Sequence, residues 1–207
     1  MSAFGVVILA AGASRRMGRP KTLLPWGATS VIGHIIAQWR TLGAARIGVV
    51  RSLDNAALEI ELDRLGVRER DQILNPEPER GMFSSIQCAA AWHGWEASID
   101  RVVLTLVDQP HLRPGTLAAL MQASAAEPLR IWQPEFAGRG RHPLVFPRSN
   151  FSEIAEASGE TLKDVLNEHR DAVSRVPLDD PGLAHDLDTP EDYQRALSAF
   201  PPEVPPA

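Results

Sequence analysis

The chain has 207 residues, enough for one domain with a full hydrophobic core. Hydrophobic residues make up 44% and charged residues 23%, the balance of an ordinary soluble globular protein, and no apolar run approaches the ~20 residues of a membrane span. The net charge of -5 gives no general attraction to nucleic acid or to anionic membranes, so neither is expected as a partner.

Segments with strand and helix character alternate along the chain, with short connections between them. In chain order we expect a strand at 4–9, a helix at 30–43, a strand at 46–52, a helix at 54–66, a strand at 71–75, a helix at 84–92, a strand at 100–108, a helix at 114–125, strands at 129–134 and 142–147, helices around 149–157 and 160–169, a strand near 173–177 and a helix at 189–200. Ser30 and Asp54 are the predicted N-caps of the first two helices.

This alternation favours an α/β fold with a mostly parallel sheet covered by helices on both faces. We expect a single domain over residues 1–200 and a disordered, proline-rich tail at 201–207. The apolar residues 1–11 are expected to form a buried strand and not a signal peptide.

A loop rich in small residues and cations, LAAGASRRMGRPK, follows the first strand and ends at residue 21. Ligands of parallel sheets bind beyond the carboxyl ends of the strands, and small residues let backbone N–H groups approach an anion. The cations of the loop are Arg15, Arg16, Arg19 and Lys21. The loop matches neither the Walker motif nor the dinucleotide fingerprint. It predicts a phosphate site of another kind, with a solvated basic turn as the alternative.

Carboxylates follow two other predicted elements. Asp108 ends a strongly apolar strand, where a buried carboxylate is costly unless it meets a cation, a metal ion or hydrogen-bond donors. Near a phosphate loop, a Mg²⁺ ligand is the favoured interpretation of Asp108. Asp186 and Asp188 precede the last predicted helix and could supply a second ligand. Capping of that helix by Asp188 or Thr189 is the alternative, and capping does not exclude metal binding.

Two further segments carry residues suited to binding. Gly81 and the serine pair Ser84–Ser85 lie at a predicted helix start, where free N–H groups suit a base edge or a ribose. The segment 136–147 is a glycine–arginine turn that feeds a strand. It could close over an anionic second substrate, and a plain basic hairpin tip is the alternative.

The remaining nucleophiles and metal ligands give no further signal. Cys88 is the single cysteine, so an internal disulfide is excluded and a reducing cytoplasm is expected as the location. Its neighbours are helix formers, which favours a small buried residue over a nucleophile. The six histidines are scattered, and none has a second ligand at the spacing of a structural zinc site.

Five motifs in order resemble the MobA-like nucleotidyltransferase family. The first loop is similar to the family pattern L-A-[AG]-G-x-[GS]-x-R-[MF]-G-x-x-K, and RGMFSSIQCA is similar to G-[ML]-x-x-S-[LI]. LVDQPHL resembles the family's second acidic motif, GRGRHPLVFP its G-x-x-G-H-P-x-x-F turn, and DLDTPEDY its closing motif. The motifs span residues 6 to 193, which makes the resemblance far more specific than any single match.

The resemblance implies a three-layer, Rossmann-like nucleotide-diphospho-sugar transferase fold and a Mg²⁺-dependent transfer of a nucleoside monophosphate with release of pyrophosphate. Within the family the chain is most similar to the molybdenum cofactor cytidylyltransferase branch. Ala11 stands where guanylyl-transferring relatives tend to carry glycine, and GMFSS resembles the cytidylyl branch. Arg141 departs from the family, because it replaces the glycine before the His-Pro pair, in a turn that would contact the second substrate.

The resemblance also implies roles for single residues. The set comprises catalytic Arg16, Lys21 and Asp108; nucleotide-binding Leu9, Ala10, Ala11, Gly12, Ser14, Arg15, Arg16, Met17, Gly18, Lys21, Gly81, Ser84 and Ser85; Mg²⁺ ligands Asp108, Asp188 and Asp186; and acceptor-binding Gln109, Arg141 and His142. The implied partners are a nucleoside triphosphate, with CTP favoured, a phosphate-bearing acceptor such as molybdopterin, and a molybdoenzyme or its chaperone. Two alternatives stay open: transfer to a sugar phosphate or another small phosphate, and a non-catalytic protein that binds nucleotide and delivers a cofactor.

Overall fold

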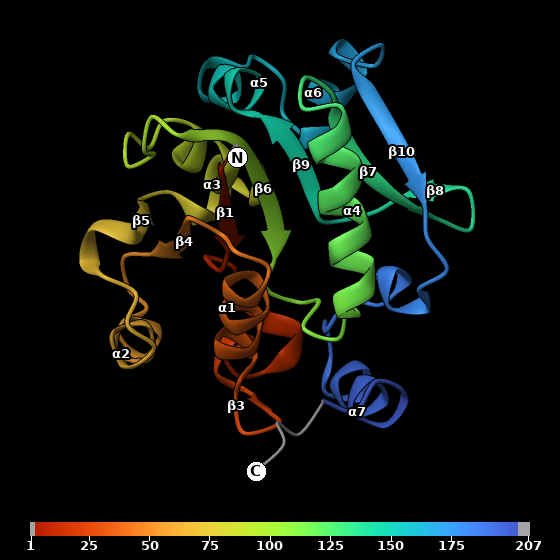
Figure 1. Ribbon diagram of the computed structural model, residues 1–207. Helices are drawn as coiled ribbons and strands as arrows, with labels where there is room; N and C mark the ends of the chain where they lie inside the picture. Colours follow the sequence, from red (N-terminus) through yellow and green to blue (C-terminus); the bar gives the residue numbers. More distant parts are fainter. Residues whose placement is uncertain (1–2, 203–207) are drawn as a thin grey trace.

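A single eight-stranded sheet forms the centre of the protein (Figure 1). The computed structural model describes residues 3–202, so the predicted tail lies outside the described residues from residue 203 onward. The strands run in the order β10-β7-β9-β6-β1-β4-β5, with β8 paired to β7, and β2 and β3 form a separate two-stranded hairpin.

The bounds of the elements follow the predicted alternation. The strands are β1 (Ala3–Leu9), β2 (Pro25–Trp26), β3 (Thr29–Ser30), β4 (Arg46–Ser52), β5 (Gln72–Asn75), β6 (Ile99–Leu106), β7 (Ile131–Phe136), β8 (Arg139–Gly140), β9 (Leu144–Pro147) and β10 (Val173–Pro177). The helices are α1 (Val31–Thr41), α2 (Ala56–Arg64), α3 (Met82–Ala90), α4 (Pro114–Ala126), α5 (Arg148–Glu153), α6 (Leu162–Glu168) and α7 (Pro190–Ala199).

Four of the seven strand pairs in the main sheet are parallel, which agrees with the predicted mostly parallel sheet. β1 pairs in parallel with β4 on one side and β6 on the other, whereas β9 is antiparallel to β6 and β7. The chain leaves β1 towards β4 and β5 and returns on the other side of β1 as β6, which makes the β1–β6 pair the switch point of the sheet. Leu9 and Leu106 are in register at the carboxyl ends of these two strands. Loops that follow them therefore meet above one crevice.

Apolar side chains cover the sheet in two layers. In β1, Val6 and Ile8 belong to one buried cluster, and Val7 and Leu9 belong to the other, as the period of two in a strand requires. The first cluster receives side chains from α1, α2, α4 and α7, and the second from α3, α5 and α6. Figure 1 shows α1 and α4 in front of the sheet. The three-layer arrangement with helices on both faces is confirmed.

Local differences from the prediction have identifiable causes. Ser30 caps α1, because its hydroxyl accepts a hydrogen bond from Gly33 N at 3.1 Å. The prediction that Asp54 caps α2 is wrong: Asn55 accepts from Leu58 N at 3.2 Å, and Asp54 lies one residue too early for that bond. The hairpin β2–β3 was not expected, since its two-residue strands are too short for a pattern to reveal.

The glycine–arginine turn is a tight hairpin between β7 and β8. Ala137 and Gly138 have φ of 51° and 72°, which matches a two-residue turn with both central residues left-handed. Arg141 N donates to Pro134 O at 2.8 Å and ties the chain after β8 to β7. The turn therefore holds residues 141 and 142 at a fixed place beside the sheet.

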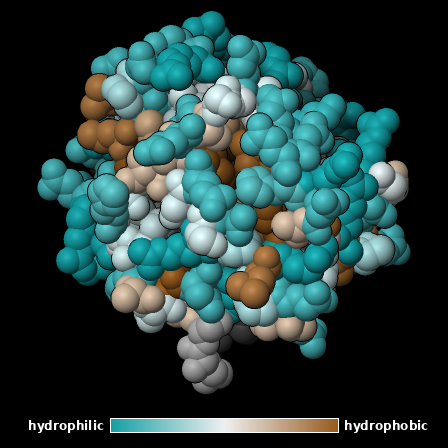
Figure 2. Space-filling view, turned by 90° about the horizontal axis from the view of Figure 1, so that it is seen from above, coloured by the Kyte–Doolittle hydropathy of each residue, from teal (hydrophilic) through white to brown (hydrophobic). Residues whose placement is uncertain are grey.

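The surface is polar over most of the visible face. Figure 2 shows this face as mainly hydrophilic, with apolar residues in separate small groups. Within residues 3–202 no helix combines the length and the apolar character that crossing a membrane requires.

Leu58 and Ile60 provide a matched test of the packing of α2. Leu58 is fully buried against the first cluster, whereas Ile60 on the same helix is 71% exposed. We expect Leu58→Ala to lower the free energy of unfolding by about 2–5 kcal/mol, because it leaves a cavity. Ile60→Ala should change it by less than about 0.5 kcal/mol. Urea denaturation of both variants measures this difference, and equal effects would contradict the orientation of α2.

Candidate active site

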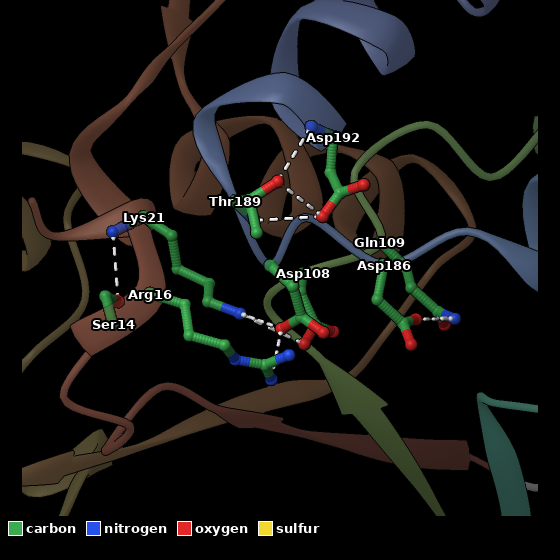
Figure 3. A network of polar contacts seen from close by, with 9 residues as sticks. Ser14, Arg16, Lys21, Asp108, Gln109, Asp186, Thr189 and Asp192 are labelled. Atoms are coloured by element: carbon green, nitrogen blue, oxygen red, sulfur yellow. Dashed lines mark hydrogen bonds and ion pairs between the residues drawn. The ribbon is translucent and has the colours of Figure 1, made fainter. Parts of the chain in front are cut away.

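The loop after β1 is held in shape by its own backbone. Ser14 has φ 50°, and its carbonyl accepts hydrogen bonds from Met17 N and Gly18 N. Met17 is buried in the first cluster and anchors the loop to the core. The Ser14 hydroxyl accepts from Lys21 N at 3.2 Å. The loop thus folds back on itself and fixes the backbone from which the Lys21 side chain extends (Figure 3).

One backbone hydrogen bond joins the two acidic motifs. Leu187 N donates to Asp108 O at 3.0 Å, and the Leu187 side chain is fully buried. The bond brings the segment before α7 against the end of β6. Asp188, the next residue, therefore lies beside Asp108 although 80 positions separate them in the chain.

Lys21 lies between the two carboxylates. Its Nζ is 3.3 Å from Asp108 Oδ2 and 3.5 Å from Asp188 Oδ1, and Arg16 reaches Asp188 Oδ1 at 3.0 Å. The Lys21 and Asp108 side chains are mostly buried, while the Arg16 side chain is 71% exposed. The three predicted catalytic residues, Arg16, Lys21 and Asp108, thus lie together (Figure 3). The Asp188 carboxylate contacts both cations.

Capping does not account for Asp188. The hydroxyl of Thr189 accepts from Asp192 N at 3.2 Å, and the Asp192 carboxylate accepts from Thr189 N at 3.0 Å. This reciprocal capping box starts α7. Of the two predicted caps, Thr189 is confirmed, and the carboxylate of Asp188 is left to face Lys21.

Asp186 takes a different place. Its Oδ1 accepts from Gln109 Nε2 at 2.9 Å, and the residue is exposed. Gln109 itself is only 6% exposed, and its Oε1 is buried without a partner among residues 3–202. The structure therefore separates the acidic pair: Asp188 shares Lys21 with Asp108, and Asp186 holds Gln109.

A pocket of about 260 Å³ lies between the first loop and the segment that precedes α3. Its lining residues are Leu9, Ala11, Gly12, Lys21, Pro78, Gly81, Met82, Ser85, Leu106, Val107 and Asp108. Seven of the predicted site residues are among them. The others predicted for the nucleotide, Ala10, Ser14, Arg15, Arg16, Met17, Gly18 and Ser84, lie outside this lining.

Asn75 is a residue that the sequence reasoning missed. It ends β5 and is 1% exposed, and its amide Nδ2 donates to the hydroxyls of Ser84 and Ser85, both at 2.9 Å. Gly81, with φ 93° and ψ −177°, adopts a backbone conformation open to glycine alone and turns the chain into α3. The rule that located Asp108, a polar residue directly after a strand, would also have found Asn75.

Burial shifts the titration of two groups in this region. The pKa of Asp108 is raised because the carboxyl is desolvated, an effect that Lys21 opposes and Asp186 reinforces. The pKa of His142 is lowered from 6.5 to about 4 by burial, with the charge of Asp186 and a hydrogen bond at the Leu104 backbone acting against the shift. His142 is therefore neutral at pH 7, with a buried Nδ1 that has no partner among residues 3–202.

The predicted acceptor residues lie on the Asp186 side of this site. Gln109 bonds to Asp186, and His142 feels the charge of Asp186. The buried Nε of Arg141 has no partner within the described part of the chain. Cys88 is half-buried and burial raises the pKa of its thiol, so a nucleophilic role is disfavoured, as expected.

The carboxylates alone do not form a metal cage. Among residues 3–202 no three His, Cys, Asp or Glu side chains are grouped so that they could hold a metal ion. A divalent ion here would need oxygens from a substrate and from water, the mode that Mg²⁺ commonly adopts at phosphate sites. Asp108 Oδ1 is buried and has no partner in the described residues, which leaves one carboxylate oxygen for such an ion.

Comparison with known proteins gives a family and several relatives. The family model described as MobA-like NTP transferase domain matches residues 6–173. The chain is 32% identical over 154 residues to a phosphoenolpyruvate guanylyltransferase of Geodermatophilus obscurus, a match that covers 73% of this chain and 64% of that protein. It is 27% identical over 201 residues to the purine catabolism protein PucB of Bacillus subtilis, with 93% and 96% covered.

The similar solved structures include Rv0371c of Mycobacterium tuberculosis H37Rv, with a TM-score of 0.79 at 29% identity, covering 96% of this chain and 100% of that one. A structure described as the manganese complex of the same protein aligns with a TM-score of 0.71 at 26% identity, covering 95% of this chain and 100% of that one. The chain spans less than two thirds of the guanylyltransferase, so the activity of that protein is not assigned to this chain.

His142 predicts a pH dependence of stability. The pKa of His142 is about 4 in the folded protein and 6.5 ordinarily. Between these pH values the unfolded chain binds a proton at His142 and the folded protein does not, so acidification favours the unfolded chain. We expect the free energy of unfolding to fall as the pH drops from 6.5 towards 4, by on the order of 2 kcal/mol from this group. Denaturation of wild type and His142→Asn across that range tests it. The variant should show the shallower decline, and identical pH profiles would contradict the burial of His142.

Proposed function

The chain belongs to the MobA-like NTP transferase family, and from this premise we propose that it transfers a nucleoside monophosphate from a nucleoside triphosphate to a phosphate group of a second substrate. The observation that carries the proposal is the meeting of Asp108 and Asp188 at Lys21, beside the pocket between the first loop and α3. A purely structural ion pair would not require two carboxylates from distant segments next to a pocket. Family and fold support nucleotidyl transfer, and the residue roles that follow are proposals.

The triphosphate binds along the first loop. Gly12 and Lys21 line the pocket, and Arg16 reaches the same carboxylate as Lys21 from the solvent side. Both cations neutralise negative charge on the β- and γ-phosphates as pyrophosphate forms. Because the loop is closed by the Ser14–Lys21 bond and anchored by Met17, the cations are held in place before the substrate arrives.

Asp108 and Asp188 are the proposed ligands of a divalent ion, Mg²⁺ or Mn²⁺. The unpartnered Oδ1 of Asp108 fits this role, and the related Rv0371c is described in complex with manganese. When bound, the ion would screen the repulsion between an anionic nucleophile and the triphosphate. Asp186 acts through Gln109 on the acceptor side, since its carboxylate is bonded there.

The transfer needs no general base. An oxygen of the acceptor phosphate, already ionised at neutral pH, attacks the α-phosphorus, and the bond from that phosphorus to the bridging oxygen of pyrophosphate breaks. Lys21, which lines the pocket, would neutralise the charge that develops on the leaving pyrophosphate. The low pKa of His142, about 4, agrees with a transfer that needs no general base, because it makes the imidazole a weak proton acceptor.

The acceptor binds on the side of Gln109, Arg141 and His142. Arg141 supplies the positive charge for its phosphate, and the neutral His142 and the carbonyl oxygen of Gln109 can hydrogen-bond its polar groups. We propose molybdopterin as the acceptor and CTP as the nucleotide. Ala11 and the segment 81–85, which resemble the cytidylyl branch of the family, support this choice.

Substitution of the three aspartates by asparagine tests the metal site. We expect Asp108→Asn to keep less than a tenth of the wild-type rate of pyrophosphate release, since a charged ligand is lost. Asp188→Asn should raise the Mg²⁺ concentration that gives half-maximal rate about tenfold or more. Asp186→Asn is the matched control, and it should raise that concentration by less than about threefold. An active Asp108→Asn, or equal metal dependence of the other two, contradicts the ligand assignment.

A panel of substrates tests the reaction itself. CTP, GTP, UTP and ATP are each combined with molybdopterin, a sugar 1-phosphate and phosphoenolpyruvate, and pyrophosphate release is followed with Mg²⁺. We expect the highest kcat/KM for CTP with molybdopterin. A preference for another pair would change the assigned substrates but would still support the proposed nucleotidyl transfer. Nucleotide binding without pyrophosphate release for any pair would instead favour a non-catalytic delivery protein.

A further inference from the structure

Asn75 organises the segment that forms one wall of the pocket. It lies at the carboxyl end of β5 and is 1% exposed. Its Oδ1 accepts from Glu77 N at 2.9 Å, and its Nδ2 donates to Ser84 and Ser85. A single side chain therefore connects the start of the turn before Gly81 with the first turn of α3.

These contacts fix which end of the Asn75 amide is the donor. A backbone N–H can only donate, so the atom facing Glu77 N must be the carbonyl oxygen. The amide nitrogen consequently faces the two serines, and its two hydrogens are directed to Ser84 Oγ and Ser85 Oγ, each at 2.9 Å. Both hydroxyl oxygens act as acceptors towards Asn75, and each retains one hydrogen to donate.

The two serines use that hydrogen differently. Ser84 donates to Gly81 O at 2.8 Å and stays within the segment. Ser85 lines the pocket, and among residues 3–202 its hydroxyl bonds only to Asn75 Nδ2, so its hydrogen has no protein acceptor. A ligand in the pocket thus meets a hydrogen-bond donor at Ser85. Because Asn75 donates to the Ser85 oxygen, the hydroxyl hydrogen is left to point to the ligand.

We propose that Asn75 is a positioning residue that holds Ser85 as a donor to an acceptor atom on the nucleobase, such as N3 or O2 of cytosine. The inference rests on the proposed nucleotide function. It is supported by the rest of the lining, since Gly12 and Lys21 form the phosphate side of the same pocket, and Pro78, Met82 and Leu106 are apolar. A nucleobase has apolar faces and polar edge atoms, which matches an apolar wall that carries one directed donor.

Binding to three kinds of ligand separates the base from the phosphates. CTP, GTP and inorganic tripolyphosphate are titrated calorimetrically with Mg²⁺, together with the 2′-deoxy form of the tighter nucleotide. We expect Ser85→Ala to raise the Kd of that nucleotide and of its deoxy form about tenfold, the loss of one hydrogen bond, and that of tripolyphosphate less than twofold. Under steady state the KM of the nucleotide should rise with little change in kcat.

Asn75→Asp reverses the polarity, because a carboxylate accepts where the amide donated and so captures the Ser85 hydrogen. It should weaken nucleotide binding as Ser85→Ala does, and the double variant should add less than about threefold. Ser84→Ala is the matched control. It should lower the Tm, since Asn75 and Gly81 O each lose a partner, yet keep the ratio of nucleotide to tripolyphosphate affinity within about threefold of wild type.

Several results would overturn the inference. Unchanged nucleotide affinity of Ser85→Ala, or an equal loss for tripolyphosphate, would show that Ser85 does not contact the base. A loss confined to the ribonucleotide would place Ser85 at the ribose. Wild-type protein that binds no nucleotide more tightly than tripolyphosphate would also refute it. These titrations contain no acceptor and therefore test nucleotide binding alone. The proposed transferase activity is tested separately, by the assay of pyrophosphate release. If Asn75→Asp does not fold, the two serine variants decide the question.

Discussion

Two carboxylates and one ammonium group are held together at the carboxyl end of the sheet, and the rest of the site depends on this arrangement. The two carboxylates, Asp108 and Asp188, repel each other because both contact the same ammonium group. Burial of Asp108 adds a desolvation cost. The cost is offset by Lys21, which contacts both carboxylates, and by the Leu187–Asp108 backbone bond that keeps the segments joined. Lys21 and this backbone bond thus hold together two carboxylates that would otherwise repel each other.

The elements that position these groups are ordinary ones. The switch point of the sheet places the ends of β1 and β6 side by side, and the buried Leu187 fixes the approach of α7. The two halves of the site have different origins. In the proposed assignment, the loops after β1 and β5 bind the nucleotide, and Gln109, Arg141 and His142 bind the acceptor.

Sequence reasoning located the strand ends, because apolar runs followed by a polar residue are visible in a single chain. It therefore found Asp108 and the first loop. It could not decide between Asp186 and Asp188, since that choice depends on the Thr189–Asp192 capping box and on the Gln109 bond, both made in three dimensions. The Asn55 cap escaped because one residue of offset has no periodic signature. Asn75 did carry a signal, a polar residue at the end of an apolar strand, but its bonds to Ser84 and Ser85 are made only in three dimensions.

The most direct test of the proposed metal and nucleotide roles is a crystal structure of the protein with CTP and Mn²⁺, in which the anomalous signal locates the metal. We predict one Mn²⁺ bound by Asp108 and Asp188 and by triphosphate oxygens, with Lys21 and Arg16 at the phosphates and the base beside Ser85. Mn²⁺ bound away from both aspartates, or a triphosphate outside the pocket between the first loop and α3, would contradict the mechanism.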